Sequence, residues 1–189
     1  CIRDRVVIKN KLADPSVFVS TQEKGDILIK DLAQIDAENV RREYWDGIFP
    51  VDPIVIARRM GVTPYLSRLG DTSGLIVCPI NEQAKIYVNQ FESKARQRFT
   101  CAHEIGHYVE RARNRDDAYT FRDRRAGRAD TPHEWYADFF AANLLMPQAV
   151  FEELVEVYGA TCDELMGYFG VSISAVRTRA RLLGLGNDI

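Results

Sequence analysis

The sequence predicts an α+β fold that is mostly helical and has one small antiparallel sheet. Apolar residues recur at helical spacing in several stretches, and two neighbouring runs, 73–79 and 84–90, are rich in β-branched residues. The chain has 189 residues, 46% hydrophobic and 28% charged, a composition typical of a globular protein with one core. Its formal net charge of −2 differs from that of proteins that coat nucleic acid. No apolar run approaches the roughly 18 residues that cross a bilayer.

The elements expected before the sheet follow from spacing and caps. Over residues 26–45 apolar side chains return at near-helical intervals, which predicts an amphipathic helix. A second helix is expected at 53–60, because Asp52 suits its N-cap, a proline suits its first turn and Gly61 ends it. Residues 62–66 are expected to form a short extended segment.

The sheet is expected to be followed by a long helix and a long connection. The two β-rich runs predict a hairpin at a sheet edge. Ser93 can cap a helix over 94–112. The charged stretch 113–131 predicts a solvated connection, although it could also grip an acidic partner or close as a lid.

The C-terminal part predicts four further helices, at 132–145, 147–158, 162–169 and 173–183. The last two resemble a helix-turn-helix pair. Three arginines of the final helix would be available for DNA phosphates. They are Arg177, Arg179 and Arg181. Because the charge excess there is small, we expect this pair to pack on the rest of the chain rather than to bind DNA.

The histidines point to metal chemistry. The chain has three, and two of them lie in the motif His103-Glu104-Ile105-Gly106-His107, an H-E-x-x-H pattern. Residues four apart share a helix face, so both imidazoles can bind one metal ion. Glu104 lies about 100° around the helix, where it can take a proton from a metal-bound water. The alternative is that both histidines are ordinary helix residues.

A catalytic metal site needs a third protein ligand. The candidates are His133, Glu134 and Asp138, and the last two share a helix face. Because neighbouring residues diverge by about 100°, only one of His133 and Glu134 is expected to bind the metal, and we favour Glu134. Thr131 and Glu134 also fit a capping box, in which the glutamate would only bond the start of its helix.

The cysteines favour a reducing compartment. The chain has four of them, far apart and without a C-x-x-C pair, which is typical of reduced thiols in a cytoplasmic protein. Cys101 is expected to face away from the two histidines, about 200° around the helix from His103. We see no basic and apolar leader at the start of the sequence.

Two blocks of this sequence resemble the ImmA/IrrE family of bacterial and phage metallopeptidases. They are residues 96–108, which contain the H-E-x-x-H motif, and residues 134–147. A strand at 85–89 just before the first block is also similar to the family. The resemblance covers residues 26–185.

The resemblance implies one zinc ion per chain. It implies that His103, His107 and Glu134 bind the zinc and that Glu104 is the catalytic base, as in gluzincin peptidases. In that arrangement Asp138 would orient a ligating histidine through its other ring nitrogen. The family usually has Asn at that position, and often has an acidic residue where this chain has His133.

The resemblance also implies a zincin-like core and a biological role. It suggests a peptidase domain at 26–160, a C-terminal helical pair at 161–189 and an N-terminal extension, 1–25, of unknown role. The expected function is a cytoplasmic zinc endopeptidase that cleaves a helix-turn-helix repressor or antitoxin in a mobile element or stress response. The substrate would extend the edge strand at 85–90. We expect no direct binding to nucleic acid and no membrane contact. The alternatives are a non-proteolytic metal-binding or DNA-binding regulator and a structural interaction module.

Overall fold

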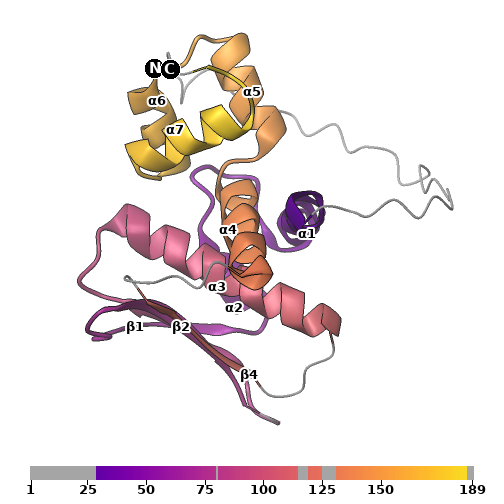
Figure 1. Ribbon diagram of the computed structural model, residues 1–189, viewed down its shortest axis with the longest axis vertical. Helices are drawn as coiled ribbons and strands as arrows, with labels where there is room; N and C mark the ends of the chain where they lie inside the picture. The colour runs from indigo at the N-terminus through magenta and orange to yellow at the C-terminus, as the bar shows by residue number, and fades with distance from the viewer. Residues whose placement is uncertain (1–28, 80, 115–118, 125–130, 187–189) are drawn as a thin grey trace, which may run out of the picture.

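The computed structural model describes residues 29–79, 81–114, 119–124 and 131–186, and confirms the α+β class (Figure 1). Seven helices and four strands occur in these residues. In chain order they are α1 (Ile29–Tyr44), α2 (Pro53–Arg59), β1 (Thr63–Ser67), β2 (Thr72–Cys78), β3 (Lys85–Asn89), α3 (Lys94–Asn114), β4 (Tyr119–Arg124), α4 (Pro132–Leu145), α5 (Gln148–Glu156), α6 (Cys162–Phe169) and α7 (Ile173–Leu182). None of the helices in the described ranges is both long and apolar enough to cross a bilayer.

The sheet differs from the prediction in two ways. Its order is β1-β3-β2-β4, and it is mixed, because β1 pairs with β3 in parallel while the other two pairings are antiparallel. The β2–β3 hairpin is confirmed, but the strand at 85–90 lies inside the sheet and not at its edge. Local alternation cannot show this, because the outer neighbours of the hairpin come from 63–67 and 119–124, which are separate segments of the chain.

The predicted connection at 113–131 is also corrected in part. Helix α3 continues to Asn114, and β4 pairs with the outer side of β2 from Thr72 to Cys78. The segments 115–118 and 125–130 lie outside the described residues. Within the described sheet the outer strands are therefore β1 and β4, and a peptide extending the sheet would have to pair there rather than with β3.

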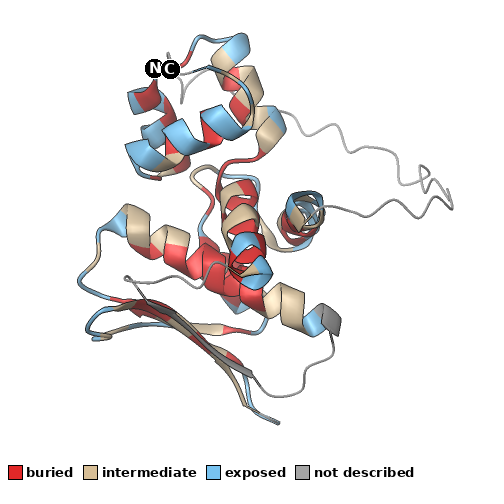
Figure 2. Ribbon diagram, viewed as in Figure 1, coloured by how far each residue is buried: buried red, intermediate tan, exposed pale blue. Residues whose placement is uncertain are grey.

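Helix α3 connects the sheet to the helical layer. Figure 1 shows α3 across one face of the sheet and α4 crossing α3 on the side of α3 that faces away from the sheet. Helix α1 lies beside α4, and α5 to α7 lie at one end of α4. Buried positions concentrate where α3 and α4 face one another and where α3 faces the sheet (Figure 2). Large side chains fill this interior, and burying each of them contributes roughly 1.5–3 kcal/mol. They include Ile76, Ile86, Ile105, Phe140 and Leu144, whereas the buried rings of Phe151 and Phe169 stack on each other between α5 and α6.

Two glycines allow these layers to approach closely. A Cβ at Gly106 of α3 would lie 3.0 Å from the Cα of Ala137 and 3.1 Å from a ring carbon of Phe140, both in α4. A Cβ at Gly74 of β2 would lie 2.4 Å from the side chain of Thr100. A Cβ does not fit at 2.4 Å, and at 3.0 Å its neighbours would have to shift. The glycines thus permit α3 to contact α4 on one side and β2 on the other.

Candidate metal centre

The middle of α3 presents two histidines to α4. His103 and His107 are one helical turn apart and fully buried, and their Nε2 atoms lie 3.0 Å from each other. Their rings meet edge to face, with centroids 4.7 Å apart. The helical spacing thus brings both imidazoles to one point, as the motif predicts.

The first turn of α4 brings a carboxylate to the same point. Oε2 of Glu134 lies 3.3 Å from Nε2 of His103, and its Oε1 lies 3.5 Å from Nε2 of His107. Thr131 caps α4 by accepting the backbone N–H of Glu134 at 3.3 Å. The cap therefore uses only the backbone N–H of Glu134. The carboxylate of Glu134 contacts the histidines instead of closing a capping box.

The three side chains fit a tetrahedral cation. Each offers one ligand atom, and these atoms all lie within 4.8 Å of one another. Ligands at about 2.05 Å from a tetrahedral zinc stand roughly 3.3 Å apart, and the contacts of 3.0, 3.3 and 3.5 Å bracket that distance. Two imidazoles and one carboxylate are also a donor set that zinc prefers, with a fourth position left for water or substrate.

The electrostatics of the group suit a cation. Burial would raise the pKa of Glu134, but its contacts with His103 and His107 lower it to about 2, so the carboxylate is anionic. Burial lowers the pKa of His107 to about 4, which keeps that ring neutral. Burial opposes the charged form of His103 as well, yet the hydrogen bonds with Asp138 and Glu134 raise its pKa to about 9. Positive charge is thus favoured where the three side chains meet.

Asp138 holds His103 from the opposite side. Its Oδ1 lies 2.9 Å from Nδ1 of His103, one helical turn after Glu134 on α4. Because a carboxylate accepts, Nδ1 donates the hydrogen bond and Nε2 is left toward Glu134 and His107. The structure therefore brings Asp138 to the position where it can fix the orientation of one ring.

The side chain of Glu104 extends from α3 toward the sheet. Its side chain is fully buried, and its Oε1 would be 3.0 Å from a Cβ at Gly74 of β2. A larger residue at that strand position would press on the carboxylate. Gly74 therefore leaves space for Glu104, a role that the strand pattern alone does not indicate.

Two residues considered from the sequence lie outside this group. His133 is exposed, and its Nδ1 lies 2.8 Å from Oε1 of Glu110. Cys101 is a buried free thiol whose pKa is raised by burial. In the described part of the chain, His103, His107 and Glu134 are the residues that could share a metal ion.

Comparison with known proteins assigns a family. No curated protein matches this chain at a significant level. The profile of the M78 peptidases, described as an IrrE N-terminal-like domain, matches residues 55–181, which is well over half of the sequence. The match spans both histidines of α3 and the first turn of α4. This chain therefore belongs to the M78 peptidase family of IrrE N-terminal-like domains.

Proposed function

We propose that this protein is a zinc endopeptidase. The observation that carries the proposal is the meeting of His103, His107 and Glu134 within 4.8 Å, with Glu104 on the next position of the same helix. A structural zinc site has four protein ligands, whereas a catalytic site has three. Three are present here among the described residues, in a chain from a peptidase family.

Each side chain has a defined task in peptide hydrolysis. Zinc, when bound, supplies a Lewis acid that polarises a carbonyl and lowers the pKa of water. His103, His107 and Glu134 hold it, and Asp138 keeps His103 in the required tautomer. Glu104 takes the proton of the attacking water and passes it to the departing amine. Burial of Glu104 excludes bulk water from this transfer.

We propose a DNA-binding repressor or an antitoxin as the substrate. The support is the resemblance of the two blocks around α3 and α4 to the ImmA/IrrE family, whose members are implicated in cleaving such proteins. The near-neutral charge of the chain also suits a protein that acts on DNA-binding proteins rather than on DNA.

A DNA-binding regulator without peptidase activity has less support. Of the three arginines in α7, Arg177 and Arg181 are exposed, but Arg179 is 5% exposed and donates to Asn143 at 2.7 Å. Two exposed arginines on one short helix give little phosphate contact, since specific DNA-binding proteins neutralise several phosphates.

The test is cleavage of a helix-turn-helix repressor or antitoxin encoded beside this protein. The zinc-loaded chain should cleave it, the Glu104→Gln variant should retain zinc and lose at least about a hundredfold in rate, and chelation should abolish cleavage. His133→Ala is the matched control, because it removes a histidine close in sequence but outside the cluster, and it should cleave normally. Salt-dependent binding to duplex DNA that survives Glu104→Gln, without cleavage, would support the regulator instead.

A further inference from the structure

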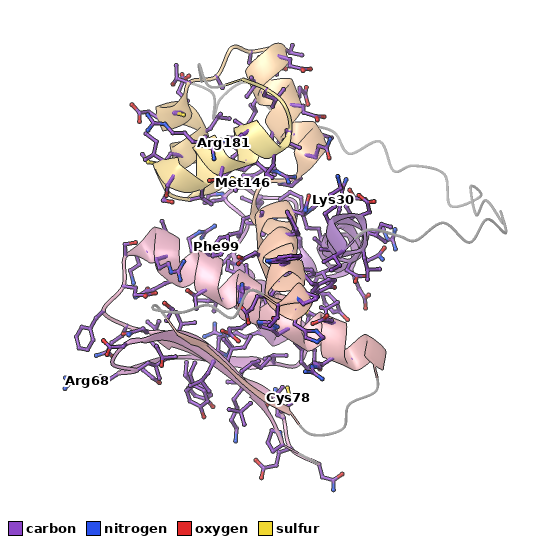
Figure 3. All side chains as sticks on the ribbon, viewed as in Figure 1. Lys30, Arg68, Cys78, Phe99, Met146 and Arg181 are labelled. Carbon is purple, nitrogen blue, oxygen red and sulfur yellow. The ribbon has the colours of Figure 1, made fainter. Side chains whose placement is uncertain are left out.

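A second feature of the molecule is a pocket of about 590 Å³ between α3, α4 and α7. This volume lies within the range of ligand sites. In Figure 3, Phe99 on α3, Met146 after α4 and Arg181 on α7 mark the three parts of the chain around it. Its walls combine large apolar side chains with one buried cation. The lining residues include Phe99, Trp135, Phe139, Met146, Leu182 and Arg179.

Arg179 is a buried cation without a carboxylate partner among the described residues. One Nη atom donates to Oδ1 of Asn143 at 2.7 Å, while its buried Nε has no hydrogen-bond partner in that part of the chain. Arg41 also donates to the backbone carbonyl of Asn143. Burial, with a smaller contribution from the charge of Arg41, lowers the pKa of Arg179 to about 10, and Glu152 acts in the opposite direction without forming an ion pair. Two guanidinium groups thus converge on one neutral residue, Asn143.

This arrangement favours an anion from outside. A buried guanidinium is costly unless a carboxylate and hydrogen bonds satisfy it, and a carboxylate is the partner that matches its planar donors. Arg96 also lines the pocket and adds positive charge, although it lies 3.8 Å from Glu92. The apolar walls select a ligand that carries a large apolar group beside its negative charge.

The pocket adjoins the metal centre through one residue. Asp138 lines the pocket and bonds Nδ1 of His103 at 2.9 Å. Phe99, which lines the pocket from α3, has its ring centroid 6.5 Å from that of His103. A polypeptide that fills the pocket therefore lies next to Asp138, which orients His103 of the metal centre. Because Asp138 is itself acidic, the carboxylate of such a polypeptide belongs at the Arg179 side.

We propose that this pocket binds an internal segment of a protein substrate in which an acidic side chain stands next to a large apolar one. The carboxylate pairs with Arg179, and the apolar side chain packs against Phe99, Phe139 and Trp135. That the segment belongs to a substrate rests on the proposed peptidase function, whereas the binding itself does not.

The experiment measures binding without cleavage. The full zinc-loaded chain carries Glu104→Gln to prevent turnover and Trp45→Phe to leave Trp135, one of two tryptophans, as the fluorescent reporter in the pocket wall. Two blocked tripeptide amides, leucyl-glutamyl-phenylalanine and leucyl-glutaminyl-phenylalanine, are titrated against it. The glutamyl peptide should bind about tenfold more tightly or better, because a carboxylate forms a charge-assisted pair with the guanidinium whereas the amide offers only a neutral acceptor.

Variants assign the preference to Arg179. Arg179→Gln should abolish the difference between the two peptides, and Arg177→Gln, an exposed arginine on the same helix, should leave it unchanged. Because Arg179→Gln removes a buried charge and can lower stability, a second variant, Ala175→Phe, fills the pocket from α7 and keeps the guanidinium. It should weaken both peptides about tenfold or more and retain its zinc.

Three results would overturn the proposal. The first is equal binding of the two peptides, and the second is a preference for the glutamyl peptide that survives Arg179→Gln. The third is that the glutaminyl peptide binds more tightly with a free C-terminal carboxylate than with a blocked one. The last would indicate a chain terminus as the occupant instead of an internal segment. Zinc content and repressor cleavage are measured separately, so failure of this proposal is distinguishable from failure of the peptidase function.

Discussion

Helix α4 carries a polar centre toward each of its ends, and the two centres differ in charge. Near its start, Glu134 and Asp138 contact the histidines of α3. Near its end, Asn143 accepts from Arg179 and Arg41. Nine residues, or roughly 13 Å along the helix, separate Glu134 from Asn143. The first centre gathers acceptors and suits a cation, whereas the second gathers donors and suits an anion.

The two ends of α4 thus carry side chains suited to opposite charges. The first centre has carboxylates and imidazoles aimed at one point, which is the pattern of a metal site. The second has one buried guanidinium, that of Arg179, which forms no ion pair with a carboxylate of the described residues, and this is the pattern of an anion site. Since the pocket beside Arg179 also reaches Asp138, the pocket adjoins both centres.

The largest expected effect comes from removing a ligand of the first centre. His103→Ala should lose the bound zinc and reduce cleavage to background, because two remaining ligands do not make a tight site. Zinc content by mass spectrometry checks this. Cys101→Ala, at another buried position of α3, should keep its zinc. Full zinc content in His103→Ala would show that the centre lies elsewhere.

A smaller effect is expected at the residue shared by the metal centre and the pocket. Asp138→Ala should weaken zinc binding by about 10- to 100-fold, because Nδ1 of His103 loses its acceptor. Asp138→Asn keeps a carbonyl oxygen as acceptor and should stay within a few fold of the native affinity. Zinc titration against a competing chelator measures both. Equal losses in the two variants would mean that the charge of Asp138 matters more than its hydrogen bond.

A substitution in the second centre should change the stability of the protein and leave its zinc content unchanged. Asn143→Ala removes the acceptor of Arg179 and should lower the free energy of unfolding by about 1–3 kcal/mol, the cost of an unsatisfied buried donor. Zinc content should not change. Denaturant unfolding of the zinc-loaded protein measures the first quantity. Loss of zinc in a folded Asn143→Ala protein would show that the two centres are coupled.

The smallest effect is expected at the crossing of α3 and α4. Gly106→Ala should destabilise the protein by about 1 kcal/mol, since its Cβ would press on the backbone of Ala137 and the ring of Phe140. Gly167→Ala in α6 meets no neighbour within 4 Å and should stabilise by about 0.5–1 kcal/mol. Thermal unfolding compares the two. If both substitutions changed the stability in the same direction, the close approach of α3 and α4 would not explain the glycine at position 106.

The first centre could be predicted from the sequence because its residues are spaced within single helices. The spacing of His103 and His107, and of Glu134 and Asp138, is set within single helices, and α4 and α6 occupy their predicted ranges. What the sequence left open was the cap alternative for Glu134. That alternative depends on the orientation of the Glu134 side chain, which in the structure points to His103 and His107 of α3.

The second centre and the sheet order were beyond local patterns. An arginine on a short amphipathic helix reads as exposed, and only the packing of α7 against α4 buries Arg179 next to Asn143. The parallel pairing of β1 with β3 and the addition of β4 to β2 join segments far apart in the chain. Such pairings depend on tertiary contacts, so alternation within β3 could not place it inside the sheet.

The measurement that tests the metal centre most directly is zinc content in Glu134→Gln compared with the native chain. The substitution keeps the size of the side chain and removes its negative charge, while the Thr131 cap, which uses the backbone N–H, is retained. We expect about one zinc per native chain and nearly none in the folded variant after the same dialysis. A folded Glu134→Gln protein that retains one zinc per chain would contradict this expectation.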